Sequence, residues 1–482
     1  MEKQFAAKYC CQLWIAFLLA IILCLLLIRI DYSTIIGSNV DVKVLVNNYV
    51  NGEQKAMNRN NSHQDLCLGR YIYIHDLPSQ YNEDLLMNCN HLFNKKVEKF
   101  HLCVYTVNSG FGPQINSTSW FLTNQFLLDL IFHSRMKKYD CLTNDSSLAS
   151  AIFVPFYAGL DLRRHLWGFN TSVRDESGRN LLKWLAEKPE WKRMWGMDHF
   201  LVGGRISNDF RRKSDKNSAW GSKFRVFPES KNISMLSIES SSWNNDCAIP
   251  YPTYFHPAKD SQVLEWQERM RRQKRQYLSS FVGAPRQRQR NSVRSIVIKQ
   301  CLDSSSECKM LDCTDTAATD CDNPIDVMKV FRRSVFCLQP PGDSFTRRSI
   351  FDSILAGCIP VFFHPGSAYA QYIWHLPKNH TKYSVFIPGE RVRDKTVRIT
   401  EILLQISKGE VEAMREEVIR LIPRIIYGDH KFGSEAIKED AFDLALKGIL
   451  DRIEKFRKEI REGRDPSINF AARNDSKFKL LP

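Results

Sequence analysis

One stretch of this chain constrains its fold more than any other, because apolar runs, a turn and a helical stripe follow one another closely. Residues 334–338 form an apolar run with the length of a buried strand. Residues 339–344 hold two prolines, a glycine and an Asp-Ser pair, typical of a turn that ends in a helix N-cap. From Phe345 apolar residues recur with helical spacing up to Gly357, and 359–363 is a second apolar run. The order strand, turn, helix, strand predicts a parallel α/β sheet.

The turn in this stretch has the chemistry of an anion site. Backbone N–H groups at a helix N-terminus attract negative charge, and Arg347 and Arg348 add two positive charges nearby. Arginines at that end oppose the helix dipole, which favours a negative ligand between them. Asp352, one turn further on, can hold sugar hydroxyls. The alternative is a surface turn with incidental arginines. The predicted donor-binding residues here are Gly342, Asp343, Ser344, Arg347, Arg348 and Asp352.

With Ser-Ala-Tyr-Ala-Gln-Tyr-Ile-Trp-His-Leu-Pro at 367–377, the stretch resembles the exostosin-like glycosyltransferases of family 47. It is most similar to the plant branch that contains xyloglucan galactosyltransferases, and the resemblance runs from about Cys67 to about Phe432. It implies the GT-B fold, two Rossmann-like domains facing a central cleft, with a UDP-sugar as co-substrate and inversion of the anomeric centre. Other branches carry an arginine three residues before the acidic residue of the helix, where this chain has Ser349.

Residues 10–30 are predicted to be a transmembrane signal anchor. Positions 10–28 are almost uninterruptedly apolar, and about 20 apolar residues span a bilayer. A cleaved signal peptide is the alternative, but the apolar core is long for one and no clean cleavage site follows. Lys3 and Lys8 place residues 1–9 in the cytosol. We therefore expect a single-pass type II Golgi membrane protein with a polar stem at 31–65 and a luminal catalytic part.

Two further features fit a luminal protein. Asn-x-Ser/Thr glycosylation triplets occur at Asn60, Asn116, Asn144, Asn170, Asn232, Asn379 and Asn474. Of the 14 cysteines, Cys10, Cys11 and Cys24 lie in or beside the anchor, which leaves an odd eleven for disulfides, so at least one thiol stays free or pairs between chains. Four are close enough to pair locally or with one another: Cys301, Cys308, Cys313 and Cys321. We expect Cys358 to be an ordinary core residue.

Residues 66–257 are predicted to form an N-terminal Rossmann-like domain that binds the acceptor. We expect strands at 70–75, 151–157 and 197–202, and helices at 120–132 and 181–195. In such a domain ligands lie beyond the carboxyl ends of the strands. The residues that follow predicted strands are His75, Asp76, Asp161, Arg205 and, after a further strand at 233–238, Glu239.

An inverting transfer needs a base for the acceptor hydroxyl and positive charge for the departing diphosphate. Arg205 is the candidate for the charge. Asp161 and Glu239 are candidates for the base, with His75 or Asp76 as alternatives. Asp161 has the best position, and the family resemblance also places an acidic residue there, although a helix-capping role explains it as well.

Residues 258–462 are predicted to form a C-terminal Rossmann-like domain for the nucleotide sugar, after a proline-containing linker at 243–257. The resemblance brings Arg286, in a Gly-Ala-Pro-Arg turn, to the diphosphate. We expect the arginines after it, up to Arg294, to be solvated. By the resemblance the helix at 441–460 crosses back over the first domain, and we expect the polar tail at 463–482 to be disordered.

Net charge and sequence motifs indicate which classes of partner the chain can bind. The formal charge of +15 is compatible with nucleic-acid binding, but no zinc finger, RNA-recognition octapeptide or helix-turn-helix pattern is present. Asp320-Cys321-Asp322 fits an Asp-x-Asp manganese motif, which we interpret as a chance match in a cysteine-rich loop. We therefore expect no cofactor, no metal and no nucleic acid. Anionic donors and a membrane surface account for the basic balance.

The function that the resemblance implies is transfer of galactose from UDP-galactose to xylose branches of xyloglucan, in cell wall biogenesis. One alternative is another UDP-sugar donor, such as galacturonic acid or arabinose, or another wall glycan as acceptor. A different class is a catalytically inactive luminal scaffold or carbohydrate-binding partner. The expected partners are the UDP-sugar, the polysaccharide and the membrane, with complexes of other Golgi glycosyltransferases left open.

Overall fold

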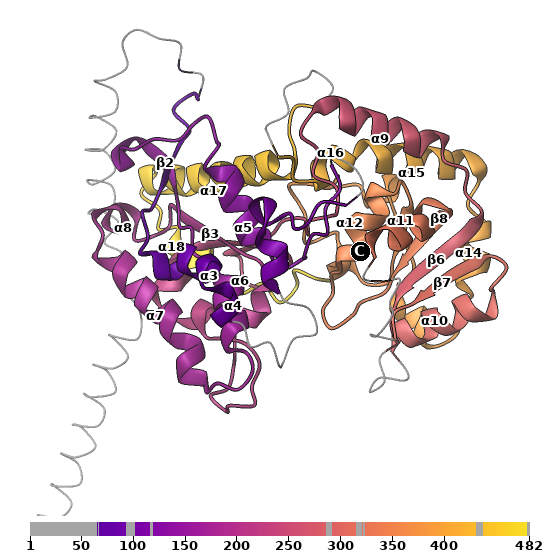
Figure 1. Ribbon diagram of the computed structural model, residues 1–482, viewed down its shortest axis with the longest axis horizontal. Coiled ribbons are helices and arrows are strands. Elements are labelled where there is room, and N and C mark those ends of the chain that lie inside the picture. Colours follow the sequence, from indigo (N-terminus) through magenta and orange to yellow (C-terminus); the bar gives the residue numbers. More distant parts are fainter. Residues whose placement is uncertain are drawn as a thin grey trace, which may run out of the picture.

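The computed structural model describes residues 65, 67–92, 102–115, 119–285, 292–314, 321, 323–429 and 437–479. They form two α/β units that lie side by side, each built on a five-stranded parallel sheet (Figure 1). The predicted parallel α/β architecture is therefore confirmed. The predicted tail at 1–9, anchor at 10–30 and most of the stem lie outside the described residues. Among the described helices, none is both long and apolar enough to span a bilayer.

The first sheet keeps its strands in chain order, and each pairs in parallel with the next. The strands are β1 (Tyr71–Ile74), β2 (Ala149–Phe153), β3 (His199–Gly203), β4 (Ser234–Ser237) and β5 (Asp246–Ala248). This order differs from the reversed order of a Rossmann sheet. The stretch at 243–257, predicted as a linker, contains β5. Because all five strands run the same way, their carboxyl ends share one edge.

Two predicted helices of the first unit are partly wrong. The helix predicted at 120–132 is α5 (Leu128–Met136), because the segment before it pairs elsewhere: the N–H of Phe121 donates to the carbonyl of Tyr254 at 2.9 Å. The helix predicted at 181–195 is divided into α7 (Thr171–Glu187) and α8 (Pro189–Met194). Pro189 lacks the N–H that would continue α7 and instead begins α8.

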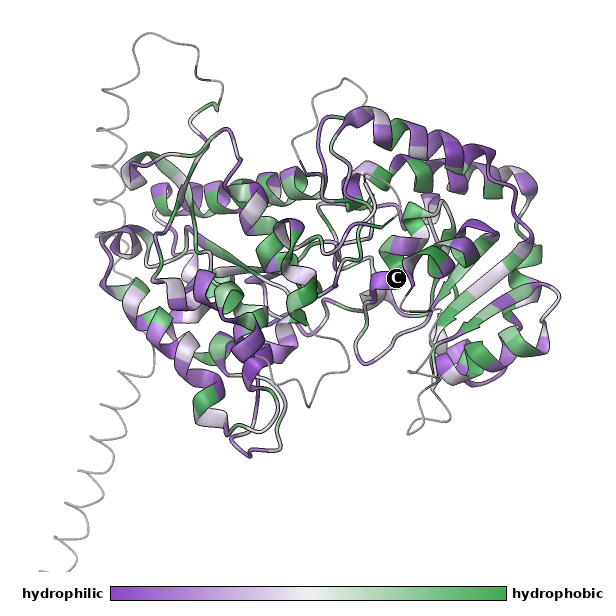
Figure 2. Ribbon diagram, in the orientation of Figure 1, coloured by the Kyte–Doolittle hydropathy of each residue, from purple (hydrophilic) through white to green (hydrophobic). Residues whose placement is uncertain are grey.

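The second sheet has a reversal of strand order. Its strands are β6 (Tyr277–Gly283), β7 (Cys308–Asp312), β8 (Ser334–Gln339), β9 (Ile359–Phe362) and β10 (Val385–Phe386). They lie in the order β10-β9-β8-β6-β7. The chain continues from β6 to β7 on one side and from β8 to β9 on the other, so the strand order reverses between β6 and β8. In doubly wound sheets this switch point is where ligands bind, outside the carboxyl ends of the strands. Green predominates on these strands, whereas α9 (Asp260–Arg272) is largely purple toward solvent (Figure 2).

The predicted strand, turn, helix and strand at 334–363 are confirmed as β8, α12 (Arg348–Leu355) and β9. The helix begins later than expected, because its N-cap is Arg347 and not Ser344, and no side chain caps it. Residues 340–346 therefore form a loop, called the β8–α12 loop below. This loop leaves the sheet beside the switch point.

The long helix α17 (Ala441–Arg461) fixes the two units to each other. It follows the second unit in the chain but runs along the first one, as the resemblance implied (Figure 1). Arg457 Nη2 donates to the carbonyl of Ala149 in β2 at 3.1 Å. The rings of Phe442 and Phe132 are 4.7 Å apart between centroids.

The predicted disorder of the polar tail is wrong for the residues described up to 479. The tail forms α18 (Ser467–Phe470) and then runs along the first unit. The N–H of Asn474 donates to the carbonyl of Ser242 at 2.8 Å, and Lys477 Nζ donates to the carbonyl of Ser241 at 2.8 Å. The tail is ordered because its backbone and its lysine find partners on the folded surface, which composition does not reveal.

Ten of the eleven cysteines beyond the predicted anchor are paired. The disulfides are Cys67–Cys141, Cys89–Cys103, Cys301–Cys308, Cys313–Cys321 and Cys337–Cys358, and Cys247 is free. Local pairing within the 301–321 cluster and a free thiol are thus confirmed. The predicted core position of Cys358 is confirmed, but this cysteine is not an ordinary core residue, because its disulfide joins the segment after α12 to β8.

Candidate active site between the two sheets

The β8–α12 loop is held by a carboxylate from the other unit. Glu239 Oε2 accepts hydrogen bonds from the backbone N–H of Thr346 at 2.8 Å and from its hydroxyl at 2.5 Å. The Tyr251 hydroxyl lies 3.1 Å from the Thr346 hydroxyl. Burial raises the pKa of Glu239, and the hydrogen bonds from Thr346 and Ser344 partly oppose that rise. The carboxylate therefore stands at the junction of the two sheets.

The two arginines after this loop point in different directions. Arg347 Nη2 donates to the carbonyl of Val282 at 2.9 Å, at the end of β6. Arg348 Nη1 instead donates to the carbonyl of Thr123 in the first unit at 2.5 Å, and its guanidinium lies 3.5 Å from the ring centroid of Tyr254. Only Arg347 is thus directed at the switch point, while Arg348 connects the two units.

A second arginine reaches the switch point from α10 (Val293–Asp303). A Cβ added to Gly283, the last residue of β6, would lie 2.6 Å from Arg294 Nη2 and 3.0 Å from Arg347 Nη2. The two guanidinium groups therefore converge over bare backbone. Both arginines come from the first residues of a helix or its N-cap, where backbone N–H groups also favour an anion. Arg294 was predicted to be solvated, but it is buried.

A cavity of about 670 Å³ lies beside this arginine pair. The ring of Phe345, from the β8–α12 loop, stacks on His364 at 4.2 Å between centroids, and Phe478 of the tail lies 5.4 Å from Phe345. The polar lining of the cavity includes a carboxylate that the sequence did not single out, Glu390. The lining residues that bear on ligand chemistry are Arg294, Gly342, Phe345, His364, Glu390, Arg393, Phe478 and Lys479. Cations, an aromatic surface and a hydroxyl acceptor thus surround one space.

Of the predicted donor residues that the structure describes, only Gly342 lines this cavity. Asp352 is 3% exposed and packs behind Arg348, with 3.4 Å between Oδ2 and Nε. Burial raises the pKa of Asp352 to about 6, partly offset by Arg348. Asp343 is exposed, and the carbonyl of Ser344 accepts the N–H of Gly342 at 2.9 Å. Arg286 lies outside the described residues. A donor contact for these side chains stays a prediction.

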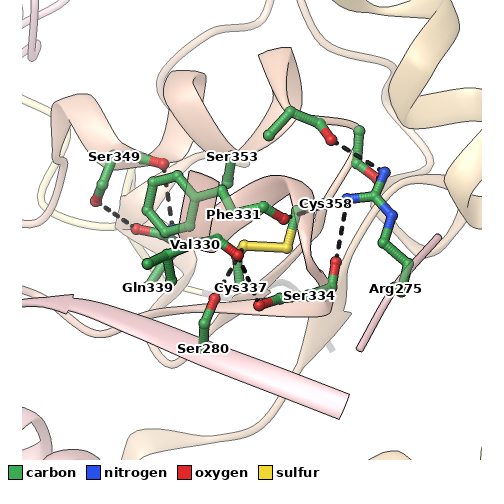
Figure 3. The surroundings of a disulfide bond; sticks show 12 residues. Arg275, Ser280, Val330, Phe331, Ser334, Cys337, Gln339, Ser349, Ser353 and Cys358 are labelled. Atoms are coloured by element: carbon green, nitrogen blue, oxygen red, sulfur yellow. Dashed lines mark hydrogen bonds between the residues drawn. A yellow bond between two sulfur atoms is a disulfide. The ribbon is translucent and has the colours of Figure 1, made fainter. Parts of the chain in front are cut away.

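The framework under the loop is held by separate sets of hydrogen bonds around a disulfide (Figure 3). Ser349 Oγ donates to Gln339 Oε1 at 2.6 Å, and the Gln339 amide returns a bond to the carbonyl of Ser349 at 3.2 Å. Ser349, at the position where the resemblance places an arginine in other branches, thus fastens α12 to the end of β8. The Cys337–Cys358 disulfide is drawn beside this pair. Arg275 donates to four backbone carbonyls around it, those of Phe331, Ser334, Ala356 and Gly357.

At the carboxyl edge of the first sheet, the loop that carries Arg205 bonds to the backbone of Glu239. Arg205 Nε donates to Asp209 Oδ2 at 2.7 Å, and its guanidinium lies 4.9 Å from the ring centroid of Phe126. Two residues after Arg205, the N–H of Ser207 donates to the carbonyl of Glu239 at 2.9 Å. Asp209 was not predicted, although it stands one helical turn after the predicted arginine. The loop after β3 is therefore part of the same site.

Asp161 faces a different part of the first unit. It lies in α6 (Ala158–His165), where Oδ1 accepts a hydrogen bond from Arg164 at 2.5 Å. Burial raises the pKa of Asp161, whereas Arg164 and a hydrogen bond with Ser177 lower it. Ser177 belongs to α7, so the carboxylate is directed at that helix. No contact between Asp161 and the β8–α12 loop is found in the described part of the chain.

His75 is part of a buried histidine pair. Its Nε2 lies 3.2 Å from Nε2 of His199, whose Nδ1 is 2.8 Å from Asp198 Oδ1. Burial lowers the pKa of His75 to about 3, so the ring is neutral. Asp76, the next residue, is exposed. Within the described ranges neither residue contacts Glu239 or Arg205, so the structure separates these two alternatives from the other candidates.

Asp129 is a buried acid that the sequence did not single out. Its Oδ2 accepts the N–H of Gly159 at 3.0 Å, and a Cβ on Gly204 would lie 3.1 Å from its Oδ1. The carboxyl group thus joins the start of α6 to the loop after β3. Burial raises the pKa of Asp129 to about 7, against the lowering effect of its backbone hydrogen bonds. In the sequence, the only sign of a special role for Asp129 was its position as an acid within an apolar, helix-like run.

The remaining predicted sites have simpler outcomes. Four acceptor asparagines are exposed and a fifth is half-buried: Asn144, Asn170, Asn379 and Asn474, then Asn232. Asn60 and Asn116 lie outside the described residues. Cys321 of the Asp-x-Asp match is bonded to Cys313, and its two aspartates are also outside the described ranges. No group of three or more metal-binding side chains occurs among the residues that the structure describes.

Comparison with known proteins decides the family. The exostosin GT47 domain matches residues 66–403. The protein belongs to the exostosin GT47 family. This GT47 protein is therefore a glycosyltransferase, and the resemblance read from its sequence is confirmed. The match covers both sheets and the β8–α12 loop.

Three relatives from Arabidopsis thaliana show where this GT47 protein lies within the family. It is 47% identical to a probable xyloglucan galactosyltransferase, GT12, over 97% of each chain. It is 52% identical to the xyloglucan galactosyltransferase MUR3, over 89% of this chain and 69% of that one. Identity to xyloglucan-specific galacturonosyltransferase 1 is 43%, over 83% of this chain and 60% of that one. A solved pneumococcal O-GlcNAc transferase, GtfA with UDP and GlcNAc, matches at a TM-score of 0.27 and 11% identity over 59% of each chain.

Proposed function

We propose that this GT47 protein transfers galactose from UDP-galactose to xylose branches of xyloglucan, with inversion and without a metal, through a GT-B arrangement of its two units. The observation that carries the proposal is the convergence of Arg294 and Arg347 over Gly283 at the switch point of the second sheet. The names of the related galactosyltransferases support the sugar and the acceptor. A Golgi location with a type II anchor and a luminal site is part of the same proposal.

In this proposal the diphosphate of the donor lies between the two arginines. Guanidinium groups bind phosphate oxygens in a bidentate manner, and they stabilise the negative charge that develops as UDP departs. Glu390 accepts hydrogen bonds from ribose hydroxyls, and the stacked Phe345 and His364 rings offer a flat surface to the nucleoside. Two fixed charges and two helix N-termini thus supply the electrostatic stabilisation that a metal ion supplies in other enzymes.

We assign the catalytic base to Glu239, because its carboxylate contacts the β8–α12 loop and its backbone carbonyl accepts a hydrogen bond from Ser207, two residues after Arg205 on the acceptor side. The acceptor oxygen attacks the anomeric carbon, the bond from that carbon to the UDP oxygen breaks, and the hydroxyl proton passes to Glu239. Burial raises the pKa of Glu239, which suits a group that must accept a proton near neutral pH. Asp161 is the second candidate, although it is directed at α7.

A galacturonic acid donor is a second candidate for the sugar. Arg393 and Lys479 also line the cavity, and they give it two further positive side chains that suit a sugar carboxylate. The similarity to a xyloglucan-specific galacturonosyltransferase favours the same alternative. The choice between the two donors therefore needs a direct comparison.

The test uses the full-length chain purified from a eukaryotic secretory host. Galactose-free xyloglucan oligosaccharides are offered with UDP-galactose, UDP-galacturonic acid or UDP-arabinose, each with and without EDTA, and products are weighed by mass spectrometry. We expect a gain of one hexose from UDP-galactose that EDTA leaves unchanged. A product formed from another UDP-sugar would change the assigned donor sugar. Loss of activity in EDTA would overturn the metal-free mechanism. A chain that binds no UDP would favour the scaffold function.

A further inference from the structure

The exposed aromatic side chains of the described residues gather in one place. They are Trp167, Phe169 and Trp220, which are 44%, 47% and 50% exposed. The rings of Trp167 and Trp220 meet edge to face, 5.8 Å apart between centroids. Large aromatic groups are seldom left exposed together unless they form an interaction surface. We call these three residues the aromatic patch.

The aromatic patch is continuous with the proposed active site. Trp220 Nε1 donates to Asp209 Oδ1 at 2.8 Å, and the Arg205 guanidinium lies 5.9 Å from the Trp220 ring centroid. The same Asp209 accepts the hydrogen bond from Arg205, and the loop that carries both also bonds to the backbone of Glu239. The indole N–H is thus satisfied by Asp209, while Trp220 as a whole stays half exposed.

A polar cavity adjoins the other end of the patch. The Phe169 ring lies 4.9 Å from the ring of His165, and His165 and Arg164 line a cavity of about 350 Å³. Helices α3 (Glu83–Met87), α4 (Cys89–Leu92), α6 and α7 supply its walls. Its polar lining includes both carboxylates and amides: Asp84, Asn88, Glu176, Ser177 and Asn180. Arg164 Nε and His165 Nδ1 are buried beside it with no hydrogen-bond partner among the described groups.

We propose that the aromatic patch and this polar cavity bind the acceptor as a chain of several sugar units. A pyranose ring has an apolar C–H face that stacks on an aromatic ring, and a rim of hydroxyls that need both donors and acceptors. The patch supplies the rings, and the cavity supplies amides, carboxylates and donors that still lack partners. This inference rests on the proposed function, because it names the surface on which the polysaccharide acceptor of that reaction lies.

The chemistry of the surface separates a glycan from other occupants. A lipid tail would need a continuous apolar lining, but charged and amide side chains interrupt the apolar lining of the cavity beside the patch. A nucleic acid would need excess positive charge, whereas Asp84 and Glu176 balance Arg164 there. A neutral, hydroxyl-rich polysaccharide satisfies both the exposed rings and the mixed polar groups.

The test measures polymer binding and nucleotide binding separately on the purified full-length chain. Galactose-depleted xyloglucan polymer and UDP are titrated in turn by calorimetry. We expect Trp167→Ala to weaken polymer binding about tenfold while the Kd for UDP stays unchanged. Trp220→Phe keeps a ring in place and should retain most of the affinity. Leu404→Ala, at the end of α14 (Ile399–Leu404), removes a side chain that is also exposed, and serves as the control with no expected effect on either ligand.

The outcomes separate this inference from the proposed function. If the wild-type chain binds UDP and Trp167→Ala binds the polymer as tightly as the wild type, the acceptor surface lies elsewhere and the transferase proposal stands. If the wild-type chain binds no UDP, the proposed function fails, and polymer binding still reports on the patch. An equal loss of UDP and polymer binding in Trp167→Ala would also overturn the inference, since it would show a general loss of structure.

Discussion

Replacing Gly283 by alanine should act on the arginine pair with little effect on the rest of the fold. Its φ of +150° is one that residues with a side chain rarely adopt, and the added Cβ would lie 2.6 Å from Arg294 Nη2 and 3.0 Å from Arg347 Nη2. Both atoms are the ends of flexible side chains, so the guanidinium groups move before the backbone does. We expect the two arginines to separate and the β6–β8 pairing to survive.

The size of the effect follows from two costs. The strained backbone at Gly283 costs about 1–2 kcal/mol of unfolding free energy, which lowers the melting temperature of a domain this size by about 2–8 °C. Loss of one charge-assisted hydrogen bond to a diphosphate costs about 1.5–3 kcal/mol of binding free energy. That second cost corresponds to a Kd for UDP about 10–150 times higher.

The assay titrates UDP by calorimetry and records thermal melting of the same samples. Gly409→Ala is the matched control, because an added Cβ there meets nothing within 4 Å in α15 (Lys408–Arg420). We expect the control to bind UDP as the wild type does and to be more stable by about 0.5–1 kcal/mol. A Gly283→Ala chain that melts earlier but binds UDP with unchanged affinity would refute the assignment of the diphosphate to this pair.

Three further changes test other parts of the structure. Glu239→Gln should retain UDP binding but lower kcat at least about 100-fold, measured with a saturating donor; equal losses of both would show that this carboxylate only anchors the loop. The pKa of Asp129 is raised to about 7, so the folded chain holds a proton that the unfolded chain has released, and stability falls as pH rises from about 4 to 7. Asp129→Asn should therefore flatten the dependence of melting temperature on pH in that window, and an unchanged slope would contradict the assignment. The Cys337→Ser and Cys358→Ser double variant opens a disulfide with a sequence separation of 21, and chemical denaturation should show a loss of about 3 kcal/mol. A loss below about 1 kcal/mol would mean that the packing around α12 holds without the bond.

The central strand–loop–helix–strand unit could be predicted because its determinants are local. Apolar runs mark β8 and β9, and Gly357 with its φ of +61° ends α12 where the pattern indicated. The direction of Arg348 could not be predicted, because it depends on Thr123 and Tyr254, which are far away in the chain. The same stretch therefore yields a correct fold and an incomplete set of ligand contacts.

The sequence failed to indicate several features of the site for the same reason. Arg294 stands in an arginine-rich segment that looks solvated, and only the position of Gly283 reveals that it meets Arg347. Glu390 belongs to a short helix, α13 (Gly389–Arg393), far along the chain from the predicted turn. Strand β5 was hidden because a three-residue strand among prolines has no periodicity to detect. Each becomes visible only when distant segments are placed together.

The central claim is that Arg294 and Arg347, and not Arg348, bind the diphosphate of the donor. The most direct measurement is the Kd for UDP of three purified full-length variants, Arg294→Gln, Arg347→Gln and Arg348→Gln, at one ionic strength. We predict that the first two weaken UDP binding at least about tenfold, because each removes a charge that faces the switch point. Arg348→Gln should leave the Kd near its wild-type value, since Arg348 bonds to the first unit. Weaker binding in Arg348→Gln alone, with the other two unchanged, would contradict the account.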